Sequence, residues 1–147
     1  MESIPPPADD AEWLRRENFV LVGHWLHPEA KLQRIERPPS TLSTPSTPAI
    51  YAFVVDGVVR YVGKATYLRS RLRGYNRAMR PGTPRKFRRV HKHLFGEWTR
   101  GKKIDIWACH HRLPDDGDLG AHERRLILDR CPAWNVQGLT ADAEVPE

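Results

Sequence analysis

Polar and apolar residues alternate in two runs near the N-terminus, over residues 19–26 and 31–35. A turn sequence, His-Pro-Glu-Ala at 27–30, separates the two runs. Alternation with a period of two is typical of strands with one buried face, so this segment predicts a β-hairpin. We expect an N-terminal extension over residues 1–37, in which a frayed tail over 1–12 precedes the hairpin.

The alternation breaks off over residues 38–48, where ten of eleven residues are Pro, Ser or Thr. Such a composition cannot bury apolar surface and predicts an extended linker. Two apolar runs follow, over 50–55 and 58–62, and Asp56–Gly57 joins them. Asp-Gly between two such runs predicts a second hairpin, because both central residues of a type I′ turn need a positive φ. Residues 104–109 alternate again and predict a third strand.

Apolar residues recur at helical spacing in three further segments. Thr66 can cap a helix that runs to about Tyr75. Residues 84–99 place apolar side chains on one face and cations on the other, which predicts a second helix. Asp118 can cap a third helix, and Cys131–Pro132 ends it. The resulting order β-β-α-α-β-α predicts a small α+β domain in which helices flank a short three-stranded antiparallel sheet.

The chain has 147 residues, enough for one such core but not for two. We assign the domain to residues 49–136 and a C-terminal tail to residues 137–147. The longest apolar run is far shorter than the roughly 20 residues of a membrane span, and we expect no secretory signal because basic and apolar leader regions are missing. Two cysteines are too few for a disulfide scaffold and favour a reducing, cytoplasmic compartment.

The positive charge is concentrated in one part of the sequence. Residues 60–103 contain 15 Lys or Arg and one acidic residue, a local balance of +14, whereas residues 1–59 carry −3 and residues 104–147 carry −5. A field this concentrated attracts polyanions, and nucleic acid is the commonest of these in a cell. A solvated basic face on a stable helix is the alternative, and a membrane surface is a third interpretation that no lipid-facing stripe supports.

Two charged residues fall on or beside faces that the helical spacing predicts to be buried. Arg71 lies three residues after Leu68 and four before Tyr75, on the flank of the apolar stripe. Glu123 lies three residues before Leu126, so the third helix directs it towards the sheet. A buried carboxylate without a partner is costly, so we expect Glu123 to be paired, protonated or bound to a metal. An ion pair with Arg71 and a ligand role both fit this spacing.

The same residues belong to a longer ordered pattern. Residues 49–51 read Ala-Ile-Tyr and residues 61–63 read Tyr-Val-Gly, with ten residues from Tyr51 to Tyr61. This pair resembles the signature of the GIY-YIG nucleases, and Ala49 stands where that family usually has Gly. The resemblance covers residues 49–136. It extends through further positions that are similar to the nuclease domain of the bacterial excision-repair endonuclease and to the family's closing block: Lys64, Ala65, Leu68, Arg71, Leu72, Tyr75, Glu123, Leu126, Ile127, Pro132, Trp134 and Asn135.

The resemblance implies hydrolysis of phosphodiester bonds with one divalent cation, Mg²⁺ or Mn²⁺. Mg²⁺ keeps several waters and takes one or two carboxylates, so Glu123 would suffice as its protein ligand. Arg71 would bind the scissile phosphate and offset the charge that grows on its oxygens in the transition state. Asn135 would position site side chains or a phosphate oxygen. Its alternative role is to cap or turn the chain after Trp134.

The resemblance also gives roles to the tyrosines. A free phenol has a pKa of about 10 and is a poor base at neutral pH, but Lys64 and a metal-bound water would favour the phenolate. We favour Tyr61 as the general base and Tyr51 as the group that orients the water or phosphate, although the two roles can be exchanged. Tyr75 stands where relatives often have His and is included in the catalytic set. The alternatives are sheet packing for the tyrosines and phosphate steering for Lys64.

The leading hypothesis is therefore a metal-dependent endonuclease that cleaves DNA. A non-catalytic nucleic-acid-binding module on the same fold and a nuclease subunit that needs a partner are the alternatives. Single-stranded, double-stranded and branched DNA, and RNA, all fit these residues. The hairpin over residues 18–37 has three open roles: it can extend the sheet, contact the substrate or mediate dimerisation. Cations outside the motif are expected to bind the phosphate backbone: Arg69, Arg73, Arg77, Arg85, Lys86, Arg88, Arg89 and Lys92.

The histidines do not change this interpretation. Together with Cys109 and Cys131 they fit no standard zinc spacing, and the sequence has no CxxC pair. His91 falls beside the apolar stripe of the second helix. It is expected either in the core or near the active site.

Overall fold

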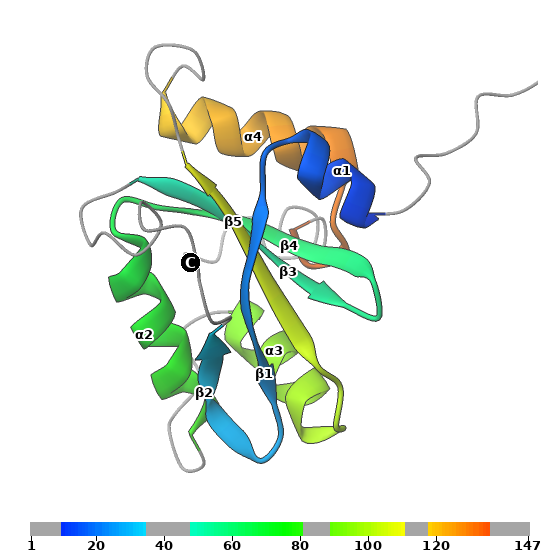
Figure 1. Ribbon diagram of the computed structural model, residues 1–147, viewed down its shortest axis with the longest axis vertical. Coiled ribbons are helices and arrows are strands. Elements are labelled where there is room, and N and C mark those ends of the chain that lie inside the picture. Colours follow the sequence, from blue (N-terminus) through cyan, green and yellow to red (C-terminus); the bar gives the residue numbers. More distant parts are fainter. Residues whose placement is uncertain (1–9, 35–47, 81–88, 111–117, 136–147) are drawn as a thin grey trace, which may run out of the picture.

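The computed structural model describes residues 10–34, 48–80, 89–110 and 118–135. A single five-stranded sheet runs through it, with the order β2-β1-β5-β3-β4, and every neighbouring pair is antiparallel. Helices cover both faces of the sheet. Helices α1 and α4 lie together at the top of Figure 1 and cover one face, and α2 and α3 lie lower in the view and cover the other. The strands are β1 (Val20–Leu26), β2 (Glu29–Arg34), β3 (Ala49–Val55), β4 (Val58–Ala65) and β5 (Ile104–His110), and the helices are α1 (Asp10–Arg16), α2 (Leu68–Met79), α3 (Arg89–Thr99) and α4 (Leu119–Arg130).

The α+β class with an antiparallel sheet is confirmed, but the prediction of three strands is wrong. The N-terminal hairpin forms as expected, and its first strand pairs with β5 from Val20 opposite Ala108 to Trp25 opposite Ile104. In a three-stranded sheet β5 would present an unpaired edge, and β1 covers that edge. Alternation predicts the hairpin because its two strands are neighbours in the chain. Alternation cannot predict that β1 also pairs with β5, which lies some 80 residues further along the chain.

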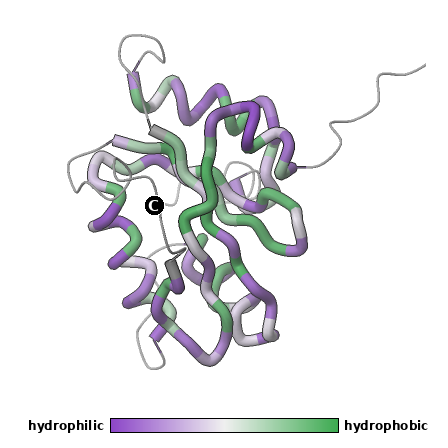
Figure 2. Tube along the Cα trace, in the orientation of Figure 1, coloured by the Kyte–Doolittle hydropathy of each residue, from purple (hydrophilic) through white to green (hydrophobic). Residues whose placement is uncertain are grey.

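The central strand β3 is buried over its whole length and separates two cores. Its residues alternate between them, as the period of a strand requires. Ala49, Tyr51, Phe53 and Val55 face the core under α2 and α3, and Ile50, Ala52 and Val54 face the core under α1 and α4. Figure 2 follows this arrangement, with hydrophobic residues along the central strands and mostly hydrophilic residues along α2 and α4.

Several element boundaries differ from those the sequence predicts. The Asp56–Gly57 turn is confirmed, with φ of 54° and 76°. Thr66 as the helix cap is wrong, because Tyr67 is the N-cap of α2 and makes no side-chain capping bond. The helix also continues past Tyr75 to Met79, since Ala78 and Met79 prolong its buried stripe. It stops at Arg80, whose extended conformation is the one favoured before proline.

The C-terminal helix α4 begins as predicted. The Asp118 carboxylate accepts a hydrogen bond from the Ala121 N–H at 2.7 Å, and Cys131 ends the helix in the left-handed conformation at φ 49°. No helix of the described residues is long and apolar enough to cross a membrane.

Helix α1 replaces part of the predicted N-terminal tail. It has seven residues, too few to be stable alone. Tertiary contacts hold it: Trp13 donates to Asp129 at 2.7 Å, and Asp10 accepts from the Arg130 guanidinium and from the Val59 N–H. Residues 1–9, the linker up to residue 47, the first part of the predicted second helix (84–88) and the tail (137–147) lie outside the described residues.

Candidate active site

Three tyrosines, Tyr51 on β3, Tyr61 on β4 and Tyr75 on α2, meet on the face of the sheet that α2 and α3 cover. We call them the tyrosine cluster. The hydroxyls of Tyr51 and Tyr75 are 2.7 Å apart and share a hydrogen bond in the protein interior. The ring centroids of Tyr51 and Tyr61 are 6.2 Å apart. Tyr61 is partly exposed, whereas Tyr51 and Tyr75 are buried.

Gly63 makes this convergence possible. In the register of the hairpin Gly63 lies opposite Tyr51. A Cβ atom at Gly63 would lie 2.6 Å from both Cζ and Oη of Tyr51 and 2.9 Å from Cε2 of Tyr61. Ordinary carbon contacts are about 3.5–4.0 Å. The tyrosine rings therefore occupy the space that any larger residue would need.

Lys64 and Glu123 form a pair on the other face of the same strand. The Lys64 Nζ lies 3.8 Å from Oε1 of Glu123, which projects from α4. The Glu123 side chain is 19% exposed and that of Lys64 is 49% exposed, so the carboxylate is the more desolvated partner. Burial raises the pKa of Glu123, and the positive charges of Lys64, Arg124 and Arg71 oppose that rise in this order.

This geometry gives Glu123 a different ion-pair partner from the Arg71 that its spacing suggested. Among the described residues the ion-pair partner of Glu123 is Lys64, while Arg71 acts on it only through its longer-range field. Lys64 is three residues from Tyr61, so the two side chains leave the strand on opposite faces. Lys64 thus faces Glu123 on one side of β4, and Tyr61 faces the tyrosine cluster on the other. The tyrosine cluster and the Glu123 pair thus lie on opposite faces of the edge strand β4.

Arg71 lines a pocket of about 340 Å³ beside the tyrosine cluster. Tyr75 and His91 form part of its wall, with the His91 ring 5.1 Å from the Tyr75 ring in an edge-to-face arrangement. His91 is therefore at the pocket. Thr66, Tyr67, Ser70 and Gly74 complete the lining. Neither Ser70 nor Gly74 was predicted as a site residue, although Gly74 lies three residues after Arg71, a spacing that places the two side by side on a helix.

Asn135 binds the edge strand β4 at Val62, directly after the second tyrosine of the motif. Its Oδ1 accepts from the Val62 N–H at 2.8 Å, and its Nδ2 donates to the Val62 carbonyl at 3.0 Å. The amide thus pairs with β4 as a neighbouring strand would. Val62 lies between Tyr61 and Gly63, so this bond pair fixes the part of β4 on which the tyrosine cluster depends. Asn135 has the geometry of a positioning residue.

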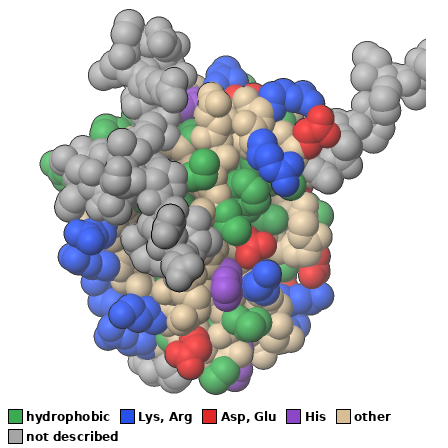
Figure 3. Space-filling model, in the orientation of Figure 1, with side chains coloured by type: hydrophobic (Ala, Val, Ile, Leu, Met, Phe, Trp, Pro, Cys, Tyr) green, Lys and Arg blue, Asp and Glu red, His purple; other side chains and the backbone are tan. Residues whose placement is uncertain are grey.

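The other predicted cations divide between two helices and the undescribed segments. Arg69, Arg73 and Arg77 are exposed on α2, where Lys and Arg side chains gather at the left of Figure 3. On α3, Lys92 is exposed and Arg89 is partly buried. Arg85, Lys86 and Arg88 lie outside the described residues.

The candidate site offers a divalent cation one carboxylate ligand, that of Glu123. Within the described ranges no group of three or more His, Cys, Asp or Glu residues is arranged to hold a metal. Mg²⁺ needs no such cage, because it retains most of its waters and binds through one or two carboxylates. The largely buried Glu123 fits that requirement.

Comparison with solved structures identifies the fold. A mutant of bacteriophage T4 EndoII superimposes with a TM-score of 0.61 and 16% identity, over 85% of this chain and 97% of that chain. The GIY-YIG N-terminal endonuclease domain of UvrC from Thermotoga maritima, bound to magnesium as its catalytic divalent cation, gives 0.42 and 26% identity, over 65% of this chain and 91% of that chain. Restriction endonuclease HPY188I in complex with product DNA gives 0.45 and 16%, over 94% and 83%.

No protein-family model and no curated protein matches the sequence. The similarity to EndoII extends over nearly all of that protein, and at its level of identity it establishes the fold alone. The resemblance in the sequence and this similarity agree. The chain has a GIY-YIG-like nuclease fold.

Proposed function

We propose that this protein is a metal-dependent endonuclease that hydrolyses phosphodiester bonds in DNA by a one-metal mechanism. The observation that carries the proposal is the position of Glu123. It is a largely buried carboxylate held against Lys64, with Arg71 in its field and the tyrosine cluster across the same strand. Burying a carboxylate in this way is costly. A site that collects an acid, two cations and phenols fits metal-assisted phosphodiester hydrolysis.

Glu123 would hold the cation, Mg²⁺ or Mn²⁺. When bound, the cation would stabilise charge on the leaving 3′ oxygen. Because burial raises the pKa of Glu123, a proton competes with the metal for the carboxylate. Lys64 counteracts this by favouring the ionised form. We therefore assign Lys64 the role of keeping Glu123 ready for a cation.

Arg71 would bind the scissile phosphate. It lines the pocket from α2, and no described acid lies within ion-pair distance of it. A guanidinium can donate two parallel hydrogen bonds to phosphate oxygens and strengthens them as negative charge accumulates. Arg71 would thus both orient the substrate and stabilise the transition state.

Tyr61 would accept the proton from the attacking water. A general base must reach a water molecule, and Tyr61 is the partly exposed member of the tyrosine cluster. Tyr51 is fully buried and its hydroxyl already shares a hydrogen bond with Tyr75. That environment suits a group that fixes geometry. Tyr75 would maintain Tyr51 in place, and Asn135 would maintain the strand beneath them.

Cleavage of supercoiled plasmid and of labelled single-stranded DNA tests the proposal. Wild type and Glu123→Ala are compared with Mg²⁺, with Mn²⁺ and with EDTA, and DNA binding is measured in parallel. We expect cutting that requires the metal and is lost in the variant while binding persists. Binding without cutting by the wild type under all conditions would contradict the proposal. That outcome would favour a binding module or a subunit that needs a partner.

A further inference from the structure

A second feature of α2 lies on the flank away from the catalytic pocket. Two depressions of about 500 and 340 Å³ run between α2 and the edge strand β2, and they share Lys31, Arg73 and Asn76. They therefore form one continuous groove, and none of its lining residues lines the catalytic pocket. We call it the basic groove. It is lined by Glu29, Ala30, Lys31, Leu32, Arg69, Leu72, Arg73, Asn76, Arg77 and Arg80.

The charge of the basic groove is strongly one-sided. Five of its lining residues are cations and one, Glu29 at the hairpin end of the groove, is an acid. No described acid forms an ion pair with Lys31, Arg73 or Arg77. Like charges this close repel one another. A polyanion seated in the groove would relieve that repulsion.

The floor of the basic groove is fixed. The Oδ1 atom of Asn76 accepts hydrogen bonds from the Trp25 Nε1–H at 2.8 Å and from the Leu32 N–H at 3.0 Å. Trp25 is fully buried. One side chain thus joins α2 to both strands of the N-terminal hairpin. The hairpin consequently supplies a wall, with Lys31 on it, at a set distance from the arginines of α2.

The cations form a row. Arg69, Arg73 and Arg77 recur every four residues, which places them along one side of α2. At 1.5 Å per residue the row spans about 12 Å. One strand of duplex DNA carries a phosphate about every 3.4 Å along the helix axis, so the row matches about four phosphates. Arginine forks suit phosphate oxygens.

We propose that the basic groove binds the phosphate backbone of the DNA substrate outside the bond that is cleaved, and that the N-terminal hairpin is thereby part of the substrate-binding surface. This inference rests on the proposed function. Arg71 and Arg73 are two residues apart and therefore point to different sides of α2, so a strand held in the basic groove would pass along the side of α2 away from the catalytic pocket. The groove contains no exposed large hydrophobic residue, which disfavours a lipid surface.

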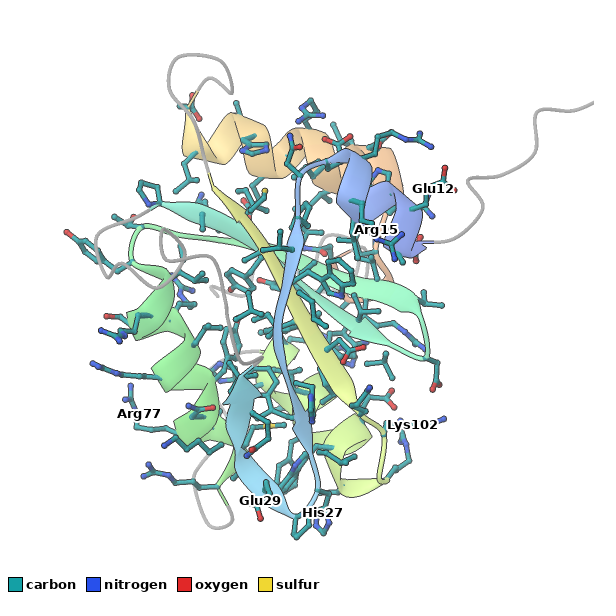
Figure 4. All side chains as sticks on the ribbon, viewed as in Figure 1. Glu12, Arg15, His27, Glu29, Arg77 and Lys102 are labelled. Carbon is teal, nitrogen blue, oxygen red and sulfur yellow. The ribbon has the colours of Figure 1, made fainter. Side chains whose placement is uncertain are left out.

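A matched pair of double variants tests the groove. Lys31→Ala with Arg77→Ala removes two charges from it. Arg15→Ala with Lys102→Ala removes two charges from elsewhere, since Figure 4 shows Arg15 on α1 and Lys102 after α3, both far from Arg77. All four side chains are exposed, so both variants should fold, which their thermal midpoints will verify. Binding of fluorescent duplex and single-stranded DNA is followed by anisotropy in EDTA, so that no cleavage occurs.

We expect the slope of log K against log[salt] to fall by about 1.8 for the groove variant on duplex DNA and by about 1.4 on single strands, because each lost phosphate contact contributes about 0.9 or 0.7. The slope of the control variant should change by much less. Equal slopes for the two variants, or no DNA binding by the wild type, would overturn the inference. Failure of the nuclease proposal would appear instead in the plasmid assay, which does not depend on these slopes.

Discussion

Gly63 offers the sharpest perturbation of the candidate site. The Gly63→Ala substitution adds one methyl group at a position where it would lie 2.6 Å from two atoms of Tyr51. An ordinary contact needs about 1 Å more than that. Tyr51 cannot yield easily, because it is fully buried and its hydroxyl is bonded to that of Tyr75.

The expected cost follows from that displacement. Forcing an extra methyl group into a packed core typically destabilises a protein by about 1–3 kcal/mol. A shift of about 1 Å in a catalytic group can reduce the rate by about a hundredfold. We therefore expect Gly63→Ala to lower the free energy of unfolding by about 1–3 kcal/mol and single-turnover cleavage by about a hundredfold, with little change in DNA binding.

Gly96 on α3 provides a matched control with the opposite sign. An added Cβ there meets no atom within 4 Å, and its φ is not in the left-handed region. Alanine in a helix interior is more favourable than glycine by about 1 kcal/mol. Gly96→Ala should therefore stabilise the protein and leave cleavage unchanged. Urea denaturation and single-turnover cleavage measure both variants. If Gly63→Ala is as stable and active as the wild type, the close approach of the tyrosines is not a feature of the working site.

Three further predictions concern stability. At pH values above 7 and in EDTA, Glu123→Gln should have a higher thermal midpoint than the wild type, because burial raises the pKa of Glu123 and the folded state therefore favours the protonated carboxyl. This difference in midpoint should vanish below pH 4.5, the ordinary pKa of the group, where the carboxyl is protonated in both states. A difference that stays constant with pH would contradict the prediction. Tyr51→Phe and Tyr75→Phe should show a coupling of about 1 kcal/mol in a urea double-mutant cycle, because they share one hydrogen bond; additive effects would argue against that bond. Asp10→Ala should cost about 3 kcal/mol in urea unfolding, because it leaves the largely buried Arg130 without its partner. The exposed Arg16→Ala should cost less than about 0.5 kcal/mol, and equal costs would contradict the account.

Local patterns predicted most of the elements. The Asp56–Gly57 turn depends on positive φ values that few residues adopt, and the Asp118 cap depends on a side-chain oxygen that accepts a backbone N–H, so both identities are informative. The sheet order could not be predicted in this way, because the pairing of β1 with β5 joins segments far apart in the chain. Helix α1 was missed for a related reason. Its stability comes from contacts with α4 and β4, and a seven-residue helix has no strong signal of its own.

Sequence patterns predicted which residues belong to the candidate site better than they predicted how those residues are arranged. Helical spacing alone predicted that Glu123 faces the sheet, and its ion pair with Lys64 on β4 is consistent with that prediction. The spacing could not choose between Lys64 and Arg71 as its partner, because that choice depends on where α4 crosses the strands. The role of Asn135 as a brace for Val62 was equally hidden, since it depends on β4 being an edge strand.

Single-turnover cleavage of a labelled duplex in Mn²⁺ tests most directly whether Glu123 supports metal-dependent cleavage of DNA. Wild type is compared with Glu123→Gln and with Asp105→Asn. Asp105 is a matched control, because burial also raises the pKa of that carboxyl and it lies on β5 away from the pocket. A metal ion supplies several kcal/mol to such reactions, which is about a thousandfold at 1.36 kcal/mol per tenfold. We predict a loss of that size for Glu123→Gln alone, with DNA still bound. Equal rates for all three proteins, or cleavage that persists in EDTA, would contradict the account.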